Sequence, residues 1–309
     1  MSTPLVTPGP RATLERLQVD GVLLLMNALW GVTFVMVKDA LGHGDPFSFL
    51  GLRFCIGALT LSALARRKML ERATLLRGGA LGVLLFLCFA MQTLGLVSTT
   101  PSRSAFITGT YVVLVPVLGW AFFRRMSSAS SWAGVAIATA GLYTLTGANL
   151  REGLSLGDVL TLGSAAAYAF HILFTERIAA KTDVVSLVAV QLWVVALLSV
   201  LCLPFAGARV HWTPSFVGAA LFCGVAASAL ALTLQVWAQA RTTAVRVALF
   251  CCTEPVFAAL TSVGVGHERL GPREWVGGGL IVLGVLVAEV SGVLWARFFP
   301  GRASAPTGG

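Results

Sequence analysis

The stretch that decides the fold class is residues 185–205, which read VSLVAVQLWVVALLSVLCLPF. This stretch contains no charged side chain and does not alternate between polar and apolar positions. About 20 mostly apolar residues in a helix cross the roughly 30 Å hydrocarbon layer of a bilayer. The continuous run also argues against the alternating strands of a membrane barrel. Residues 185–205 therefore predict a transmembrane helix.

Nine further apolar segments accompany this one, so the sequence predicts ten transmembrane helices. The ten are residues 21–37, 47–65, 78–97, 104–123, 132–147, 158–175, 185–205, 215–240, 244–265 and 275–295. Of the 309 residues, 57% are hydrophobic and 11% are charged, whereas soluble domains carry about 25% charged residues. We expect an all-α polytopic membrane protein, which excludes a soluble enzyme, a disordered chain and a secreted disulfide scaffold.

The basic residues set the expected orientation, because cytoplasmic loops carry an excess of Lys and Arg. Of the 22 Lys and Arg, fifteen fall in the gaps on one side of the ten spans and six on the other, while Arg53 lies inside a span. Both termini are therefore expected in the cytoplasm, with residues 1–20 as a leading segment and 297–309 as a disordered tail. The net charge of +9 has this topological explanation, and we expect no binding of nucleic acid.

The two halves of the chain share an internal repeat. The pattern Thr-Thr-x-x-Arg at residues 99–103 recurs at residues 242–246, a shift of 143 positions. At the same shift Gln92, Trp132, Gly134 and Gly141 correspond to Gln235, Trp275, Gly277 and Gly284. Near the start of each half, Asp20 and Trp30 correspond to Asp158 and Tyr168 at a shift of 138. We therefore expect two five-helix repeats, residues 21–147 and 158–296, joined by a loop at 148–157.

An odd number of spans in each repeat has a mechanistic consequence. With five spans per copy, the second copy must enter the membrane from the opposite side. Many secondary transporters use such inverted repeats to alternate between two openings. Two mirrored packings of one element give two states of similar energy, from which a static pore or scaffold gains little. The repeat therefore favours a carrier that works by alternating access.

Short motifs along both halves are similar to those of a known family. The first half carries Trp30-Gly31-x-x-Phe34-x-x-x-Lys38, Arg53 in the second span and Pro116-Val117 in the fourth. The second half carries Gly157-Asp158, Ala167-Tyr168-Ala169, the stretch from Gln235 to Glu254-Pro255-Val256, and Gly277 to Gly284. As a set, these residues resemble the EamA-type family of the drug/metabolite transporter superfamily. The resemblance covers about residues 20–295.

This resemblance implies both an architecture and an activity. The expected architecture is a ten-helix inverted-repeat carrier in a bacterial inner membrane. The expected activity is secondary active transport of small organic solutes, exporting amino acids, metabolites or drug-like compounds.

Two ionisable residues inside spans are candidates for coupling or charge recognition, because a charge within the bilayer is costly. Glu254 directly precedes Pro255, which removes a backbone hydrogen bond. Its carboxyl could bind a cation, accept a proton, or serve only to hold neighbouring backbone groups. Arg53 is either a clamp for a substrate carboxylate or phosphate or a tie between helices.

Aromatic, amide and imidazole side chains within the spans are the candidates for substrate binding. They are Trp30, Gln92, Tyr111, Tyr168, His171, Gln235 and Trp237. Such side chains combine contact area with a polar group, which suits a cavity for partly apolar solutes. Ordinary packing or a position at the membrane interface is the alternative for each. Arg103 and Arg246 each open a span, on opposite sides, and are candidates either for gates or for headgroup anchors.

The sequence offers no motif for catalysis or for ATP hydrolysis. Each of the three lysines lacks the preceding glycine of a phosphate-binding loop, and no Gly-x-Ser-x-Gly elbow is present. All six cysteines lie in apolar stretches, so we expect no metal and no cofactor. The expected partners are a small-molecule substrate, the lipid bilayer and protons. The competing hypotheses are a carrier of phosphorylated or nucleotide-linked sugars, an intramembrane enzyme, a channel and a non-transporting membrane scaffold.

Overall fold

The computed structural model describes residues 10–65, 67–98, 101–146, 154–207, 209–264 and 270–298. All regular secondary structure in these ranges is helical, and one isolated β-bridge joins Gly44 to Val210. The elements are α1 (Pro10–Leu41), α2 (Pro46–Leu64), the 3-10 helix η1 (Arg67–Leu70), α3 (Arg72–Ser98), α4 (Pro101–Gly109), α5 (Tyr111–Phe123), α6 (Ala129–Thr146), α7 (Leu156–Ala179), α8 (Val184–Ala206), α9 (Pro214–Phe222), the π-helix η3 (Cys223–Leu230), α10 (Ala231–Gln239), α11 (Ala244–Cys251), α12 (Glu254–Gly264) and α13 (Pro272–Phe298).

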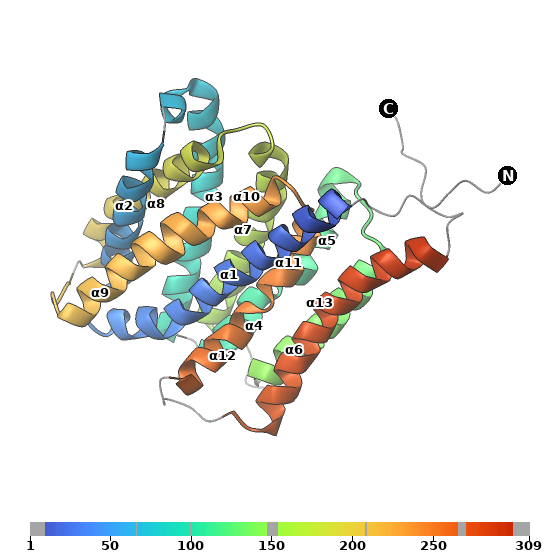
Figure 1. The fold of residues 1–309 in the computed structure, drawn as a ribbon. Helices are drawn as coiled ribbons and strands as arrows, with labels where there is room; N and C mark the ends of the chain where they lie inside the picture. Colours follow the sequence, from blue (N-terminus) through green and yellow to red (C-terminus); the bar gives the residue numbers. More distant parts are fainter. Residues whose placement is uncertain are drawn as a thin grey trace.

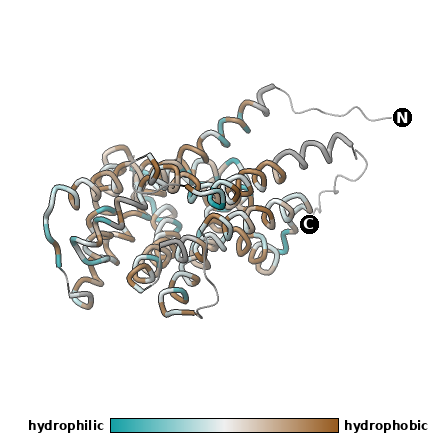
Figure 2. The backbone as a smooth tube through the Cα atoms, turned by 90° about the horizontal axis from the view of Figure 1, so that it is seen from below, coloured by the Kyte–Doolittle hydropathy of each residue, from teal (hydrophilic) through white to brown (hydrophobic). Residues whose placement is uncertain are grey.

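Seven helical segments of the described chain are long and apolar enough to cross a membrane. They are Pro46–Leu64, Arg72–Ser98, Phe106–Phe123, Leu156–Ala179, Val184–Phe205, Pro214–Gln239 and Ala244–Thr261. Each coincides with one of the ten predicted spans. The other three predicted spans lie on α1, α6 and α13 as far as the chain is described. Figure 2 shows hydrophobic residues along most of the helices, as an all-helical polytopic membrane fold requires.

Polar side chains fix where several helices begin. Asp45 caps α2 by accepting hydrogen bonds from the backbone N–H groups of Phe47 and Ser48. At the start of α7 the Ser155 hydroxyl accepts from the Asp158 N–H, and the Asp158 carboxylate accepts from the Ser155 N–H at 2.7 Å. This reciprocal arrangement is a capping box, which satisfies two backbone donors that the first turn leaves free.

Two of the predicted spans are interrupted. The fourth divides at Thr110 into α4 and α5, and the ninth divides at a turn ending with Thr253 into α11 and α12. The hydroxyl of Thr110 donates to the carbonyl of Ile107 at 2.5 Å, and that of Thr253 donates to the carbonyl of Phe250 at 2.7 Å. The sequence indicated a broken helix only at Pro255.

Helices α6 and α13 lie side by side at one edge of the bundle (Figure 1). A Cβ atom on Gly141 would lie 2.8 Å from the carbonyl oxygen of Gly277, and one on Gly284 would lie 2.7 Å from that of Gly134. Such approaches exclude any side chain, so the two backbones touch through glycine, as small residues allow between membrane helices. The contacts therefore pair Gly141 with Gly277 and Gly134 with Gly284.

Helix α1 passes through the middle of the bundle and contacts α9, η3, α10, α11 and α12, all from the second half of the chain (Figure 1). It begins at Pro10, before the first predicted span, and α1 begins at the same end of the bundle at which α13 ends (Figure 1). This central position brings residues of the first half against α11 and α12, the two parts of the interrupted ninth span.

Candidate functional site

Three buried aromatic side chains meet at the centre of the bundle. Trp30 of α1 and Tyr168 of α7 meet edge to face with ring centroids 6.4 Å apart. Tyr111, the first residue of α5, meets Tyr168 in the same manner at 5.2 Å. The ring of His171 stacks on Tyr168 at 6.0 Å. The structure thus brings four predicted site residues together.

Glu254 lies at the same centre. It is the first residue of α12, directly after the interruption, and it is half-buried. Its carboxyl lies within electrostatic range of the hydroxyls of Tyr111 and Tyr168. The thiols of Cys88 and Cys252 are also within range. Among the described side chains, no Lys or Arg forms an ion pair with Glu254.

The residues at this centre include two pairs of positions that correspond in the two halves. Trp30 and Tyr168 are related by the shift of 138, and Tyr111 and Glu254 are related by the shift of 143. The shift of 143 also relates the two interrupting residues, Thr110 and Thr253, which make the same local hydrogen bond. Corresponding positions therefore meet at one place, beside the two interrupted helices.

Arg53 is buried on α2, beside the π-helix η3. Its Nε donates to the hydroxyl of Ser228 at 3.2 Å, and its Cζ lies 5.0 Å from the ring centroid of Phe54 and 5.2 Å from that of Phe89. In the described part of the chain no carboxylate forms an ion pair with it. One cationic group with a single hydroxyl partner is suited to bind an anionic group.

The π-helix also holds the central tryptophan. The indole Nε1 of Trp30 donates to the carbonyl of Ala227 at 2.9 Å, one residue before the partner of Arg53. Single π-helical turns occur frequently at functional sites, because their wide turn frees backbone groups. The element η3 therefore positions both Trp30 and Arg53.

The remaining predicted amides have different surroundings. Gln235 is fully buried on α10, and its amide lies close enough to the Tyr168 hydroxyl to interact with it. Neither of its amide atoms makes a hydrogen bond of normal geometry within the described chain. Gln92 donates to the hydroxyl of Thr108 at 3.2 Å and so ties α3 to α4. Gln235 thus belongs to the central site, whereas no described contact joins Gln92 to it.

Trp237 lies near the end of α10 and makes its polar contact away from the centre. The guanidinium of Arg241 covers its ring, with Cζ 4.1 Å from the centroid, and donates to its carbonyl oxygen at 3.0 Å. The indole of Trp237 thus packs against Arg241, next to the turn that follows α10.

One of the two predicted gate residues has a clear partner. Arg246 of α11 forms an ion pair with Asp20 of α1, with Nη2 and Oδ1 2.5 Å apart. The guanidinium also donates to the hydroxyl of Thr242 at 3.4 Å. The side chain of Arg103 lies outside the described ones. The sequence analysis identified Asp20 only as a position of the repeat. Its negative charge next to an apolar span was the feature that could have indicated an ion pair with Arg246.

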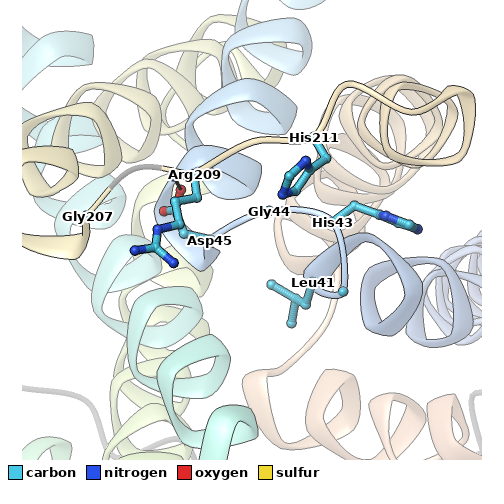
Figure 3. A pocket seen from close by; sticks show the side chains of 8 residues that line it. Leu41, His43, Gly44, Asp45, Gly207, Arg209 and His211 are labelled. Carbon is cyan, nitrogen blue, oxygen red and sulfur yellow. Dashed lines mark hydrogen bonds between the residues drawn. The ribbon is translucent and has the colours of Figure 1, made fainter.

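A pocket of about 430 Å³ opens between the α1–α2 and α8–α9 connections (Figure 3). It is lined by Leu41, Gly42, His43, Gly44, Asp45, Gly207, Arg209 and His211. Asp45 ties the two connections together, since its Oδ2 accepts from the Arg209 N–H at 3.1 Å. Burial opposes ionisation of this carboxylate, but hydrogen bonds from Ser48, Arg209 and Phe47 outweigh it and hold the Asp45 pKa below its usual value. None of the predicted site residues lies in this pocket.

The described residues contain no cluster of three or more His, Cys, Asp or Glu side chains that could hold a metal ion. The six cysteines are free thiols. Polar residues that the sequence analysis did not single out lie near the centre, among them Gln191, whose Oε1 lies 2.8 Å from Nε2 of His171. Their signal in the sequence was an uncharged polar side chain inside an otherwise apolar span.

The chain is similar to known proteins along nearly its whole length. The model of the EamA-like transporter family matches residues 19–147 and 155–289. An "Uncharacterized transporter" of Archaeoglobus fulgidus is 31% identical over 282 residues, which cover 91% of this chain and 89% of the relative. The "Uncharacterized inner membrane transporter YedA" of Escherichia coli K12 is 23% identical over 290 residues, covering 91% and 94% of the two chains.

Two further comparisons extend this similarity. A "Probable amino-acid metabolite efflux pump" of Salmonella typhimurium is 28% identical over 183 residues, which cover 56% of this chain and 59% of that protein. A solved crystal structure matches the fold with a TM-score of 0.77 at 18% identity, covering 89% of this chain and 98% of the other. With both halves matched by one family model, the chain belongs to the EamA-like transporter family, and it is a multi-pass membrane transporter.

Proposed function

We propose that this transporter is a secondary active carrier that exports small organic solutes, amino acids and related metabolites foremost, by alternating access. The observation that carries the proposal is that Trp30 and Tyr111 both contact Tyr168, with Glu254 within electrostatic range of the two tyrosine hydroxyls, beside two interrupted helices. Carriers built from inverted repeats place their sites at the interface of the repeats, where discontinuous helices expose backbone groups. The name of the Salmonella relative supports the solute class.

The proposed architecture is ten transmembrane helices in two inverted repeats, residues 21–147 and 158–296. The glycine contacts between α6 and α13 support it. Gly134 corresponds to Gly277 and Gly141 to Gly284, and the contacts run from Gly134 to Gly284 and from Gly141 to Gly277. Crossed contacts between corresponding residues are the mark of a two-fold relation. A two-fold axis in the membrane plane would pass between α6 and α13 and between Trp30 and Tyr168.

The chemistry of the central site suits a solute with an apolar body and a charged end. The rings of Trp30, Tyr111 and Tyr168 offer contact area, while Glu254 offers a negative or protonated carboxyl. Arg53, held beside Trp30 by η3, offers a cation for a carboxylate. A nucleotide-linked or phosphorylated sugar would need several such cations, so this second class of solute has less support.

The driving force we propose is a proton gradient, with Glu254 as the group that binds the proton. Both termini face the cytoplasm in this scheme, because the basic residues gather on that side. The bacterial inner membrane is the proposed location, as in the name of the Escherichia coli relative. Catalysis has no part in the proposal, because all the named relatives described above are transporters or pumps.

Two ion pairs serve as alternating gates in this scheme. The pair of Asp20 and Arg246 closes the cytoplasmic side. Their repeat counterparts are Asp158 and Arg103, which we propose to act on the opposite side. We propose that one pair separates when the other forms, so that the centre opens to one compartment at a time.

The test is transport by the purified protein in liposomes. Vesicles loaded with a panel of amino acids and metabolites should show counterflow of at least one of them. Tyr168→Phe should weaken it, whereas Tyr143→Phe, which alters an exposed tyrosine on α6, should leave it unchanged. A broad panel with no flux in either direction would count against a carrier and favour a membrane scaffold, and flux that never saturates would favour a channel.

A further inference from the structure

Buried polar atoms without a hydrogen-bond partner concentrate on α7 and α10. The described residues contain eight such side-chain atoms, and six of them belong to these two helices. The six are the Tyr168 hydroxyl, His171 Nδ1, Thr175 Oγ1, both amide atoms of Gln235 and Gln239 Oε1. Buried polar groups nearly always bond to protein or to ordered water. The side chains of Tyr168 and Gln235 lie close enough to interact with each other, whereas His171 Nδ1, Thr175 Oγ1 and Gln239 Oε1 have no partner among the described residues. Their concentration in one place therefore points to a common ligand.

These atoms lie along one seam between the two helices. On α7, positions 168, 171 and 175 are three and four residues apart and so share a face. On α10, Gln235 and Gln239 are one turn apart. The Nε2 atom of Gln239 donates to the carbonyl of Ile172 at 3.0 Å, which fixes this face of α10 against α7. The seam runs from the central site toward the C-terminal ends of both helices.

The Thr175 hydroxyl does not make the hydrogen bond to its own helix that a buried threonine usually makes. A helical threonine ordinarily donates to the carbonyl four residues earlier. Thr161 does so on the same helix, to Gly157 at 2.7 Å, and Thr233 does so on α10, to the carbonyl of Ala229. Thr175 is as buried as Thr161 and makes no such bond. Its hydroxyl is therefore available to a ligand in the seam.

Two other side chains use one of their two polar atoms in a hydrogen bond and leave the other without a partner among the described residues. His171 uses Nε2 for Gln191 and leaves Nδ1, and Gln239 uses Nε2 for Ile172 and leaves Oε1. A buried water typically makes about three hydrogen bonds to groups of this kind. Single free atoms repeated at each turn of the helices suit a row of water molecules better than one large ligand.

We propose that a row of water molecules fills this seam and carries protons between Glu254 and the face at which α7 and α10 end. Glu254 lies within electrostatic range of Tyr168, at the inner end of the seam. The proton leaves the Glu254 carboxylic acid, and each water accepts one proton and passes on another. Glu254 becomes a carboxylate, the last water releases a proton to bulk water at that face, and no side chain along the seam changes its net protonation. The inference rests on the proposed function in taking Glu254 as the proton-binding group.

Hydroxyl-radical footprinting by X-ray radiolysis, on wild-type protein in lipid nanodiscs, tests for the water. Radicals form from water in contact with a side chain. Relative to the intrinsic reactivity of each residue type, we therefore expect Tyr168 and His171 to be modified at least about fivefold faster than Phe49 and Met26. Phe49 and Met26 are completely buried, but among apolar neighbours. Equal rates for all four would overturn the proposal. This measurement needs no substrate, so its outcome is independent of whether the protein transports.

Time-resolved infrared spectroscopy tests for the proton route. The carboxylic acid band that is absent in Glu254→Gln should shift on transfer to D₂O, and exchange should slow about tenfold when Thr175→Val and Gln239→Leu are combined, because the seam loses its polar lining. Thr161→Val makes the same change at an equally buried position on α7 and should leave exchange unchanged. Unchanged exchange in the combined variant would overturn the route, and the footprinting remains decisive if that variant does not fold.

Discussion

Asp20 and Arg246 lie 226 positions apart in the chain, yet their carboxylate and guanidinium are 2.5 Å apart. The pair joins α1 to α11 at the face where α1 begins. Both side chains keep some contact with solvent, with 22% of the Asp20 side chain and 17% of that of Arg246 exposed. With about a fifth of each side chain exposed, the pair lies at the margin of the bundle and not in its core.

Neutralising either partner should unbalance transport. Directly bonded pairs typically couple by 0.5–3 kcal/mol, so we expect Asp20→Asn or Arg246→Gln to slow counterflow by about tenfold, because one of two balanced states is lost. The charge swap Asp20→Arg with Arg246→Asp should recover most of the rate. Initial rates of solute exchange in liposomes measure the effect.

The surface pair of Arg125 and Glu176 provides the control for this cycle, since 61% of the Arg125 side chain is exposed. Arg125→Gln should change exchange little, because exposed pairs contribute about 0–1 kcal/mol. A charge swap at Asp20 and Arg246 as inactive as the single variants, in protein that still folds, would contradict the role of this pair.

Glu254→Gln should remove the response of transport to a proton gradient while leaving solute exchange at equal pH on both sides. An amide has nearly the same shape as a carboxylic acid but cannot release the proton. Uptake and efflux rates between pH 5 and 8 measure the response, with Glu176→Gln as the matched control. Unchanged pH dependence in the variant would remove Glu254 from the coupling mechanism.

Gly277 and Gly279, two positions apart on α13, should respond oppositely to alanine. A Cβ at Gly277 would lie 2.3 Å from the backbone nitrogen of Leu145, whereas nothing lies within 4 Å of one at Gly279. We expect Gly277→Ala to destabilise the fold by about 1–3 kcal/mol through overpacking, and Gly279→Ala to stabilise it by up to about 1 kcal/mol. Denaturation midpoints in detergent distinguish the two. Equal midpoints would show that α6 and α13 do not touch at this point.

Asp45→Ala should destabilise the protein by about 1 kcal/mol through loss of the helix cap, in a pH-dependent manner. The folded-state pKa of Asp45 is lowered, so its ionised form adds stability that is present at neutral pH and lost as the pH falls through the folded value, below about pH 4. The melting difference between wild type and variant should therefore shrink in acid. Asp45→Asn, which cannot ionise either, should show the same shrinkage, because the stability that is lost in acid belongs to the wild-type carboxylate. A difference that stays constant in acid for both variants would exclude the carboxylate as its source.

Much of the helix pattern was predictable from hydropathy, but only one of the two interruptions was indicated by the sequence. Length and apolar composition located the helices, because crossing a bilayer demands both. Pro255 indicated the interruption at Thr253, because proline has no backbone N–H to donate to a carbonyl of the preceding turn. Nothing comparable stands at Thr110, where Pro116 lies well inside α5. That break was recoverable only by applying the shift of 143 to Thr253.

The aromatic members of the central site were predictable as residue types, but not as a set in contact. Trp30 and Tyr111 both contact Tyr168. Gln92 and Trp237 belong to the same predicted set and yet make their described contacts elsewhere. Helical spacing gives the face of a residue within its own helix, but which neighbour covers that face depends on packing between elements distant in the chain.

The π-helix η3 sets the rotational phase of everything that follows it in its span. Its wide turns accommodate about one residue more than an α-helix would, and one residue corresponds to about 100° around the axis. The side chains of Gln235 and Gln239 therefore face α7 only because of this rotation of about 100°. Removing one residue between positions 223 and 230 should therefore rotate these two amides away from α7 and toward a different helix. Conversely, the insertion of one residue into a regular α-helix would have been enough to orient them toward α7.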